Sequence, residues 1–264
     1  MLDIISVKGI EKSLDSSLKG KLNIEIKECS ESTNDDVKNL ARNGGSEGSV
    51  IIACRQTNGK GRLGRAFFSP DNTGVYMSLL LRPDLKPEDA TLITTAAAVS
   101  VCKALSQMGV NNSAIKWVND VYLNDKKVCG ILTEAGFDAS GKLSFAVLGV
   151  GLNMYEPAGG FPDDIKNIAG AVFSEKQEGL EDRFIAGFLN AFYGFYVDIT
   201  SKKHIAEYKR LCFLYGREVD VIKGDSVRQA RVSGLDDNCG LIVEYADGEK
   251  DVLTSGEVSL KVKK

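Results

Sequence analysis

The chain has 264 residues, of which 43% are hydrophobic and 26% are charged, and its formal net charge is -3. These values are ordinary for a globular protein, and the length allows one large domain with a small second one. The slightly negative charge argues against a protein that attracts nucleic acid over its whole surface. The sequence shows no signal peptide and no apolar run of membrane length, so we expect a cytoplasmic protein without a membrane partner.

Cysteine and histidine give little support for metal or triad chemistry. The six cysteines are scattered and form no C-x-x-C pair, so neither a zinc site nor thioredoxin-like chemistry is indicated, and we expect reduced thiols. With a single histidine, His204, a histidine-based triad or metal site is not expected. We expect His204 on the surface of a helix near the junction of two domains.

The N-terminal part of the chain predicts alternating strands and helices. Residues 10–18 form a short amphipathic segment, and residues 22–27 alternate apolar and polar side chains as a strand does. The Ser-Thr-Asn run at 32–34 supplies a good N-cap for a helix that ends at the glycine pair 44–45. Capping alone would explain this run, with contact to a ligand as a second role. Residues 49–54 are typical of a buried strand.

A loop that alternates glycines with cations occupies residues 55–70. Its glycines let a ligand approach the backbone N–H groups, and Lys60, Arg62 and Arg65 add positive charge, so the loop suits a phosphate or another anion. Its G-x-G-x-x-G spacing matches the dinucleotide-binding fingerprint, but the turn sequence at 67–74 cannot form the helix which that fold requires, and we reject it. The other alternative is a surface hairpin whose charges serve only solubility.

The middle of the chain predicts further strands around a long helix. A strand is expected at 74–81, a helix that packs its alanines against a sheet at 88–108, a hairpin turn at 124–125, and strands at 128–134 and 143–151. Asn119 and Asp120 would otherwise be a simple turn, and Lys127 a solvated strand end. The last strand leads into a Gly-Val-Gly-Leu-Asn run at 149–153, whose glycines permit close approach of a ligand.

The pattern changes near residue 216. Before it, the Pro-, Gly- and Asp-rich residues 155–170 predict a long loop, followed by an aromatic-rich helix at 180–199 and a short helix at 202–214. Beyond it, short alternating runs are separated by turn sequences at 224–225, 236–238 and 247–248. Short strands with frequent turns predict a small all-β barrel of about fifty residues.

Several of these features together resemble the biotin protein ligase family. They are the Ser-Thr-Asn run, the glycine-basic loop, the Lys-Trp-Val-Asn-Asp run at 116–120, Lys127 with the Gly-Ile-Leu run at 130–132, and the Gly-Val-Gly-Leu-Asn run. They occur in the family's order and spacing over about residues 25–255. The resemblance implies an α/β (α+β) fold, with a mixed-sheet catalytic domain like that of class II aminoacyl-tRNA synthetases and a small SH3-like β-barrel. We expect an N-terminal extension at 1–25, the catalytic domain at 26–214 and the SH3-like domain at 215–264.

The resemblance also implies an activity. The family activates biotin with ATP as biotinyl-5′-AMP and transfers it to the acceptor lysine of a biotin carboxyl carrier protein or domain. ATP and Mg²⁺ are thus the expected co-substrate and metal, and the carrier the expected protein partner, with a homodimer as one option. The residues before the catalytic domain are too few for the DNA-binding module of many bacterial relatives, so no DNA binding is expected.

The resemblance assigns roles to individual residues. Lys127 is expected to bridge the biotin carboxylate and the α-phosphate, and Arg62 to contact the adenylate. The full set expected around biotin is Ser32, Thr33, Asn34, Gln56, Lys60, Gly61, Arg62, Lys127, Gly130, Gly149 and Gly151. The set expected around ATP or the adenylate is Arg62, Arg65, Phe67, Asn119, Asp120, Lys127 and Asn153, with Mg²⁺ near Asn119 and Asp120. The chain departs from the family pattern at three positions: Lys60 stands where relatives often carry arginine, Phe67 where some carry tryptophan, and Val118 where proline is usual.

Three other functions compete with this interpretation. A lipoate or octanoate ligase shares the fold, but the intact glycine-basic loop argues against it. A biotin sensor without enzymatic activity would not need the phosphate-facing Lys127 and Arg62. A nucleic-acid-binding protein built on the C-terminal barrel is disfavoured by that barrel's many acidic residues. We also expect the loop at 56–70 to be mobile when empty and to become ordered around ligand anions.

Overall fold

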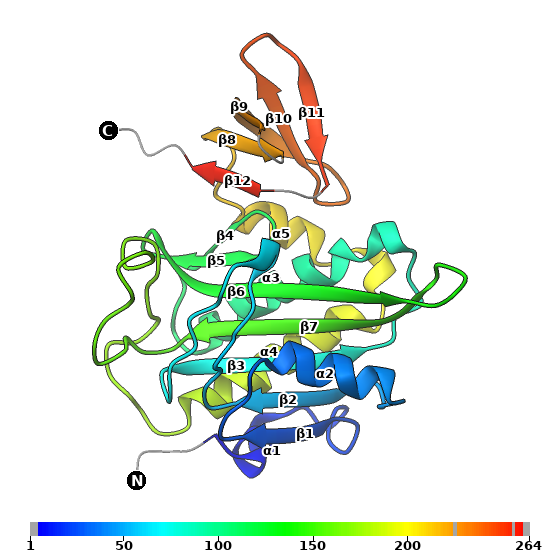
Figure 1. The fold of residues 1–264 in the computed structure, drawn as a ribbon, viewed down its shortest axis with the longest axis vertical. Helices are drawn as coiled ribbons and strands as arrows, with labels where there is room; N and C mark the ends of the chain where they lie inside the picture. The colour runs from blue at the N-terminus through cyan, green and yellow to red at the C-terminus, as the bar shows by residue number, and fades with distance from the viewer. Residues whose placement is uncertain (1–4, 224–225, 255–256, 261–264) are drawn as a thin grey trace.

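The computed structural model describes residues 5–223, 226–254 and 257–260. Figure 1 shows a large sheet with helices on both faces and a smaller second sheet at one end of the molecule. In the described part, the large sheet has seven strands in the order β1-β2-β3-β7-β6-β5-β4. The predicted mixed α/β fold with a separate C-terminal β unit is therefore confirmed.

The large sheet is mixed because only its first pair of strands is parallel. Strand β1 (Asn23–Lys27) runs parallel to β2 (Ser49–Ala53), and helix α2 (Thr33–Arg42) connects them. The other neighbouring strands, β3 (Gly74–Leu81), β4 (Ala114–Lys116), β5 (Asp120–Leu123), β6 (Lys126–Phe137) and β7 (Leu143–Asn153), pair antiparallel. Both β2 and β3 are buried along their whole length, as their continuous apolar runs predict.

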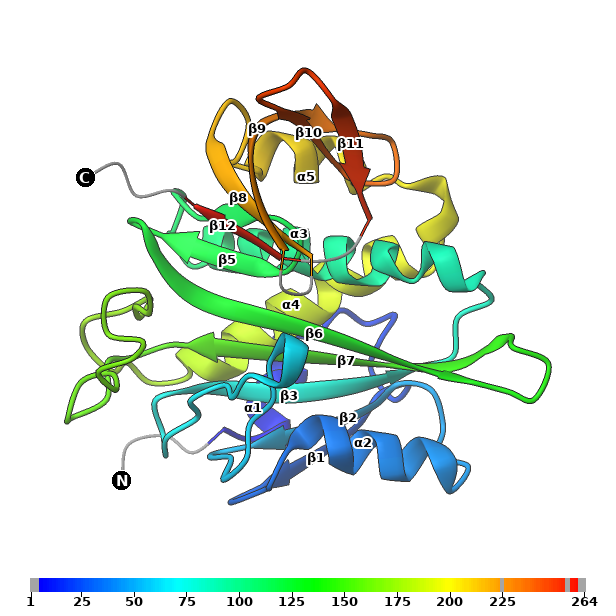
Figure 2. The same cartoon turned by 45° about the horizontal axis from the view of Figure 1, so that its top comes forward.

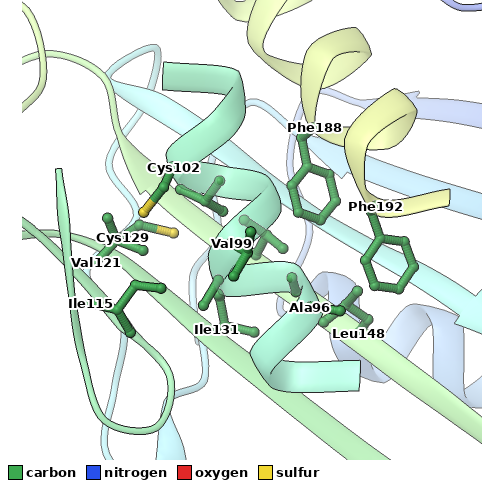
Figure 3. Packing of buried hydrophobic residues seen from close by; sticks show 14 of the residues in the cluster. Ala96, Val99, Cys102, Ile115, Val121, Cys129, Ile131, Leu148, Phe188 and Phe192 are labelled. Carbon is green, nitrogen blue, oxygen red and sulfur yellow. The ribbon is translucent and has the colours of Figure 1, made fainter. Parts of the chain in front are cut away.

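The main core lies between the large sheet and two long helices. Helix α3 (Thr91–Gln107) packs on β5 and β6 on one side and on α4 (Leu180–Tyr196) on the other. Figure 3 shows Ala96 of α3 next to Leu148 of the sheet, with the rings of Phe188 and Phe192 of α4 on the same side of the core. Small alanine side chains let the helix approach the sheet closely, so the predicted close packing is confirmed. The predicted aromatic-rich helix is α4, and its Phe184, Phe188 and Phe192 are buried in this core. Among the described residues, no helix is long and apolar enough to cross a membrane.

Local signals explain where the predicted elements shift. Helix α1 (Val7–Ser13) begins earlier than the predicted segment at 10–18, because the Ser6 hydroxyl accepts the backbone N–H of Gly9 and caps it. Ser32 occupies the N-cap position of α2. The predicted hairpin turn is confirmed, since Asn124 and Asp125 both have the positive φ that a tight β-turn of this kind requires.

The second sheet follows a short helix, α5 (Ile205–Leu211). Its strands are β8 (Glu218–Lys223), β9 (Ser226–Leu235), β10 (Leu241–Tyr245), β11 (Lys250–Leu253) and β12 (Glu257–Leu260). They pair antiparallel in the order β11-β10-β9-β8-β12. The predicted turn at 224–225 lies outside the described residues, and the domain boundary near 215 stays a prediction. Figure 2 shows this sheet at the end of the molecule where α5 and β5 lie.

The prediction for His204 is wrong, because its side chain is 0% exposed. The residue precedes α5, and α5 packs on α3, so the ring points inward to a position 2.9 Å from the Thr95 hydroxyl. It also meets the ring of Phe195 edge-on. The residues next to His204 in the sequence give no sign of this packing. Nδ1 has no hydrogen-bond partner among the described residues.

Acid should therefore weaken the fold through His204. Burial lowers the pKa of His204 to about 4, below its ordinary value, so the stabilisation is full above about pH 6.5 and is lost as the pH falls towards 4. At pH 5 the loss should be about 2 kcal/mol of unfolding free energy. Urea denaturation at pH 7.5 and pH 5 should show this loss in the wild type. In His204→Gln, which keeps an N–H for Thr95, the loss should be much smaller, and equal losses would contradict the prediction.

Gly194 offers a separate way to raise stability. It lies within α4 on an exposed face, and a Cβ added there would meet no atom within 4 Å. Because glycine in a helix costs backbone entropy, Gly194→Ala should raise the free energy of unfolding by about 0.5–1 kcal/mol. Gly187→Ala is the comparison on the same helix, since its Cβ would lie 2.9 Å from the Gln107 amide oxygen. Urea denaturation should show a smaller gain, or a loss, for Gly187→Ala.

Candidate functional site

A single cavity of about 720 Å³ brings the predicted site residues together. It lies between the large sheet, the start of α2, the glycine-basic loop and the segment at 161–169. All sixteen residues that the resemblance assigns line it: Ser32, Thr33, Asn34, Gln56, Lys60, Gly61, Arg62, Arg65, Phe67, Asn119, Asp120, Lys127, Gly130, Gly149, Gly151 and Asn153. Residues from five separate stretches of sequence thus meet around one space.

One end of the cavity has a polar wall of fixed hydrogen bonds. The backbone N–H of Thr33 donates to the side-chain oxygen of Gln56 at 2.9 Å, and the Thr33 and Ser78 hydroxyls lie 2.7 Å apart. Ser78 donates in turn to the Asn34 side-chain oxygen at 2.6 Å. Since Ser78 uses its proton on Asn34, the Thr33 hydroxyl is the donor in both of its contacts, with Ser78 at 2.7 Å and with the Gln56 side-chain oxygen at 3.2 Å. The wall therefore presents oriented polar groups to a ligand.

The sequence did not predict the residues that form hydrogen bonds to this polar wall from the side away from the cavity. Ser78 is fully buried in β3, and Asn34 donates to Glu134 at 2.8 Å, which also receives Lys38 at 2.7 Å. The only signal was a lone serine inside an otherwise apolar strand. A buried hydroxyl needs a partner, so this serine pointed to a polar group across the fold without naming it.

Glycines line the sheet side of the cavity, where an added Cβ would meet a neighbouring side chain. In register, Gly149 of β7 pairs with Ser78, and a Cβ at Gly149 would lie 2.1 Å from the Asn34 side-chain oxygen. Further along β7, Gly151 pairs with Gly130 of β6, and the ring of Phe67 lies over both. A Cβ at Gly151 would lie 2.5 Å from that ring. These glycines therefore allow the side chains of Asn34 and Phe67 to approach the strand backbone closely.

The other end of the cavity is charged. The Lys127 ammonium lies 2.7 Å from the Asp120 carboxylate, and these side chains are 29% and 18% exposed. Asn119 donates to Asp120 at 3.0 Å and accepts from the Arg62 guanidinium at 2.9 Å. Lys127 is therefore an ion-paired, largely buried group and not a solvated strand end. We refer to Arg62, Asn119, Asp120 and Lys127 as the charged cluster.

The glycine-basic loop folds back on itself over this cavity. Phe67 donates its N–H to the Gly59 carbonyl, and the turn at its tip contains η1 (Arg62–Gly64), which is too short to open a dinucleotide-binding helix. The rejection of that fold is thus confirmed. Lys60 reaches out of the loop to Asp35 of α2 at 2.7 Å. Partial burial raises the pKa of Asp35, but Lys60 and Lys38 outweigh it and hold that pKa below its ordinary value.

The long loop after β7 forms the opposite wall. Its residues Phe161, Ile165 and Ile168 line the cavity, and none of them was predicted. The backbone of Lys127 clamps this loop, because its N–H donates to the Ile168 carbonyl at 2.7 Å and its carbonyl accepts from Gly170 at 2.9 Å. Asn153 also donates to the Gly170 carbonyl at 3.0 Å. Lys127 thus joins the wall and the charged cluster.

A metal at this site would have few protein ligands. No group of three or more His, Cys, Asp and Glu side chains suited to a metal occurs in residues 5–223, 226–254 and 257–260. The charged cluster offers the Asp120 carboxylate and the Asn119 amide oxygen, and Asp125 is a second carboxylate in the cavity lining. Oxygen donors in small number suit a Mg²⁺ ion that takes most of its ligands from phosphates and water.

Two family models and several relatives of known sequence match the chain. The model of the biotin/lipoate A/B protein ligase family matches residues 27–153, and that of the biotin protein ligase C-terminal domain matches residues 214–261. The bifunctional ligase/repressor BirA of Bacillus subtilis is 37% identical over 138 residues, which are 52% of this chain and 42% of that protein. BirA of Escherichia coli is 28% identical over 218 residues, which are 81% of this chain and 67% of that protein.

Solved structures agree with this result. The biotin protein ligase of Aquifex aeolicus in complex with biotin and ATP has a TM-score of 0.71 and 26% identity, and the match covers 91% of this chain and 99% of that one. The chain spans less than half the length of the Bacillus BirA proteins that it matches. From its two matching domains and this structural likeness, the chain belongs to the biotin/lipoate A/B protein ligase family and carries the C-terminal domain of the biotin protein ligases.

Proposed function

We propose that the chain is an ATP-dependent biotin protein ligase. It would form biotinyl-5′-AMP from biotin and ATP and transfer the biotinyl group to the acceptor lysine of a biotin carboxyl carrier protein or domain. The observation that carries the proposal is one cavity with two unlike ends. A fixed polar wall at one end suits a small neutral ring, and the charged cluster at the other suits a carboxylate and phosphates.

In the first half-reaction, the biotin carboxylate attacks the α-phosphate of ATP and pyrophosphate leaves. Two anions must approach each other, so cations are needed where negative charge builds up. Lys127, which is ion-paired with Asp120 in the empty cavity, would exchange this partner for the carboxylate and α-phosphate oxygens. Arg62 binds the phosphate from the loop side while Asn119 orients its guanidinium.

The remaining site residues bind and orient the two substrates. Thr33 and Gln56, together with Ser32 and Asn34, hold the ureido ring of biotin by hydrogen bonds at the polar wall, next to Gly149. Lys60 and Gly61 cover this ring from the loop. Arg65, Phe67 and Asn153 hold the nucleotide over Gly130 and Gly151. Asp120 and Asn119 would hold a Mg²⁺ ion, which supplies charge neutralisation of the phosphates when bound.

In the second half-reaction, the ε-amine of the acceptor lysine attacks the carbonyl of the mixed anhydride. A carbon–nitrogen amide bond forms, the carbon–oxygen bond to phosphate breaks, and AMP leaves with the electron pair. The glycine-basic loop protects the anhydride from water until the acceptor arrives. We place this chemistry in the cytoplasm, where the six free cysteines would stay reduced.

Biotin-dependent exchange of labelled pyrophosphate into ATP, with Mg²⁺ present, tests the first half-reaction. Exchange that requires biotin supports the proposal, and transfer to a purified carrier domain tests the second step. Exchange with lipoate or octanoate in place of biotin would assign the chain to another branch of the family. No exchange with any of these acids would leave a binding protein and would overturn the proposal.

A further inference from the structure

Trp117, the only tryptophan of the chain, connects the cavity to the second sheet. Trp117 lines the cavity and is 4% exposed, and its indole N–H donates to the Cys239 carbonyl at 2.7 Å. Cys239 belongs to the turn at 236–240 between β9 and β10, which we call the junction turn. None of its residues lines the cavity. The contact is therefore a buried hydrogen bond between the cavity wall and an element outside the cavity.

The junction turn is built to hold this carbonyl in place. The Asp236 carboxylate accepts the backbone N–H groups of Asn238 and Gly240, each at 2.7 Å. Asp236 also donates its own N–H to the Gly240 carbonyl at 3.0 Å. Cys239 itself has a φ of 60° and is 1% exposed. Because one carboxylate fixes two N–H groups, removing it should release the turn and the carbonyl that Trp117 uses.

The residues that follow Trp117 lead directly into the charged cluster. The Val118 carbonyl accepts a hydrogen bond from the buried Tyr208 hydroxyl at 3.1 Å, so helix α5 also fixes the position of Val118. The next residue, Asn119, orients Arg62 and donates to Asp120. A shift of Trp117 would thus move Asn119 and, through it, the guanidinium that faces the phosphates.

We propose that the junction turn positions the nucleotide end of the active site, with Trp117 as the positioning residue that transmits its hold to Asn119 and Arg62. This inference rests on the proposed function for its kinetic consequence, and on geometry alone for its structural one. The polar wall around Thr33 and Gln56 has no contact with the junction turn, so ATP binding should depend on the turn while biotin binding should not.

The test compares two aspartates of the second sheet. Asp236→Ala opens the junction turn. Asp247→Ala removes a carboxylate that accepts one backbone N–H, from Glu249, in the turn between β10 and β11, away from the cavity. We expect Asp236→Ala to raise the KM for ATP in pyrophosphate exchange by about tenfold, with the KM for biotin within about twofold of wild type. Asp247→Ala should change neither, and Asp236→Asn, which keeps an acceptor oxygen, should restore most of the ATP affinity.

Tryptophan fluorescence gives a readout that needs no activity. Trp117 is the only tryptophan, so a red shift of its emission in Asp236→Ala, but not in Asp247→Ala, would report its release into a wetter environment. If Asp236→Ala does not fold, Trp117→Phe replaces it, since it removes the indole N–H and should raise the KM for ATP alike. Equal emission and equal KM values in the two aspartate variants would overturn the inference. Absence of exchange in the wild type would instead overturn the proposed function, while the emission would still decide the junction contact.

Discussion

Lys127→Ala should lower the rate of biotin-dependent pyrophosphate exchange by about 10²–10³-fold, the usual cost of removing one group that stabilises developing charge. Lys127 is the cation at the centre of the charged cluster, and its loss leaves the Asp120 carboxylate in a cavity meant for anions. The loss should appear in kcat as well as in KM, because the transition state carries more charge on the bridging oxygens than the bound substrates do.

Lys142→Ala provides the control for this variant. Lys142 is also a lysine of the large-sheet region, but it is 64% exposed, and its ion pair is with the exposed Asp84. Its replacement should leave exchange unchanged. Lys127→Ala that folds, binds biotin and still exchanges pyrophosphate within about fivefold of the wild-type rate would contradict the role given to this lysine. Circular dichroism and a melting curve would show whether the variant is folded.

The sequence was most informative where several short motifs had to agree. The Ser-Thr-Asn run, the glycine-basic loop, the Asn119-Asp120 pair and Lys127 each had a simple structural alternative when taken alone. Together they resembled one family, and the structure places all of them around one cavity. The alternatives were also partly true, since Asn119 does lie in a turn and Ser32 occupies the N-cap position of α2, although its side chain makes no capping hydrogen bond. A residue that ends an element is well placed to face a ligand as well.

The sequence was least informative about contacts between distant buried polar groups. Ser78, Glu134 and Lys38 support the polar wall from three different elements, and no local pattern joins them. His204 shows the same limit, because a surface position was predicted for a side chain that is buried. Its ring lies beside the Thr95 hydroxyl, more than a hundred residues away in the sequence. Periodicity describes the faces of an element, but it does not identify the partner of a polar atom.

A single methyl group at position 149 should disable the other end of the site. In Gly149→Ala the new Cβ would lie 2.1 Å from the Asn34 side-chain oxygen, so Asn34 must move. Asn34 is the acceptor for Ser78, and Ser78 in turn is hydrogen-bonded to Thr33. The hydroxyl that should meet the ureido ring thereby loses its orientation. We expect the dissociation constant for biotin, measured by calorimetry, to rise about 100-fold, or about 3 kcal/mol.

Two other glycine substitutions separate this effect from general damage. Gly194→Ala adds the same methyl group on an exposed helix face and should bind biotin as the wild type does. Gly151→Ala lies two residues further along β7, but its Cβ would meet Phe67 and not Asn34. It should therefore weaken ATP binding more than biotin binding. Because overpacking also costs about 1–3 kcal/mol of stability, each variant needs a melting curve beside its calorimetry. A folded Gly149→Ala that binds biotin within about threefold of wild type would show that the Asn34–Ser78–Thr33 chain does not orient the ligand.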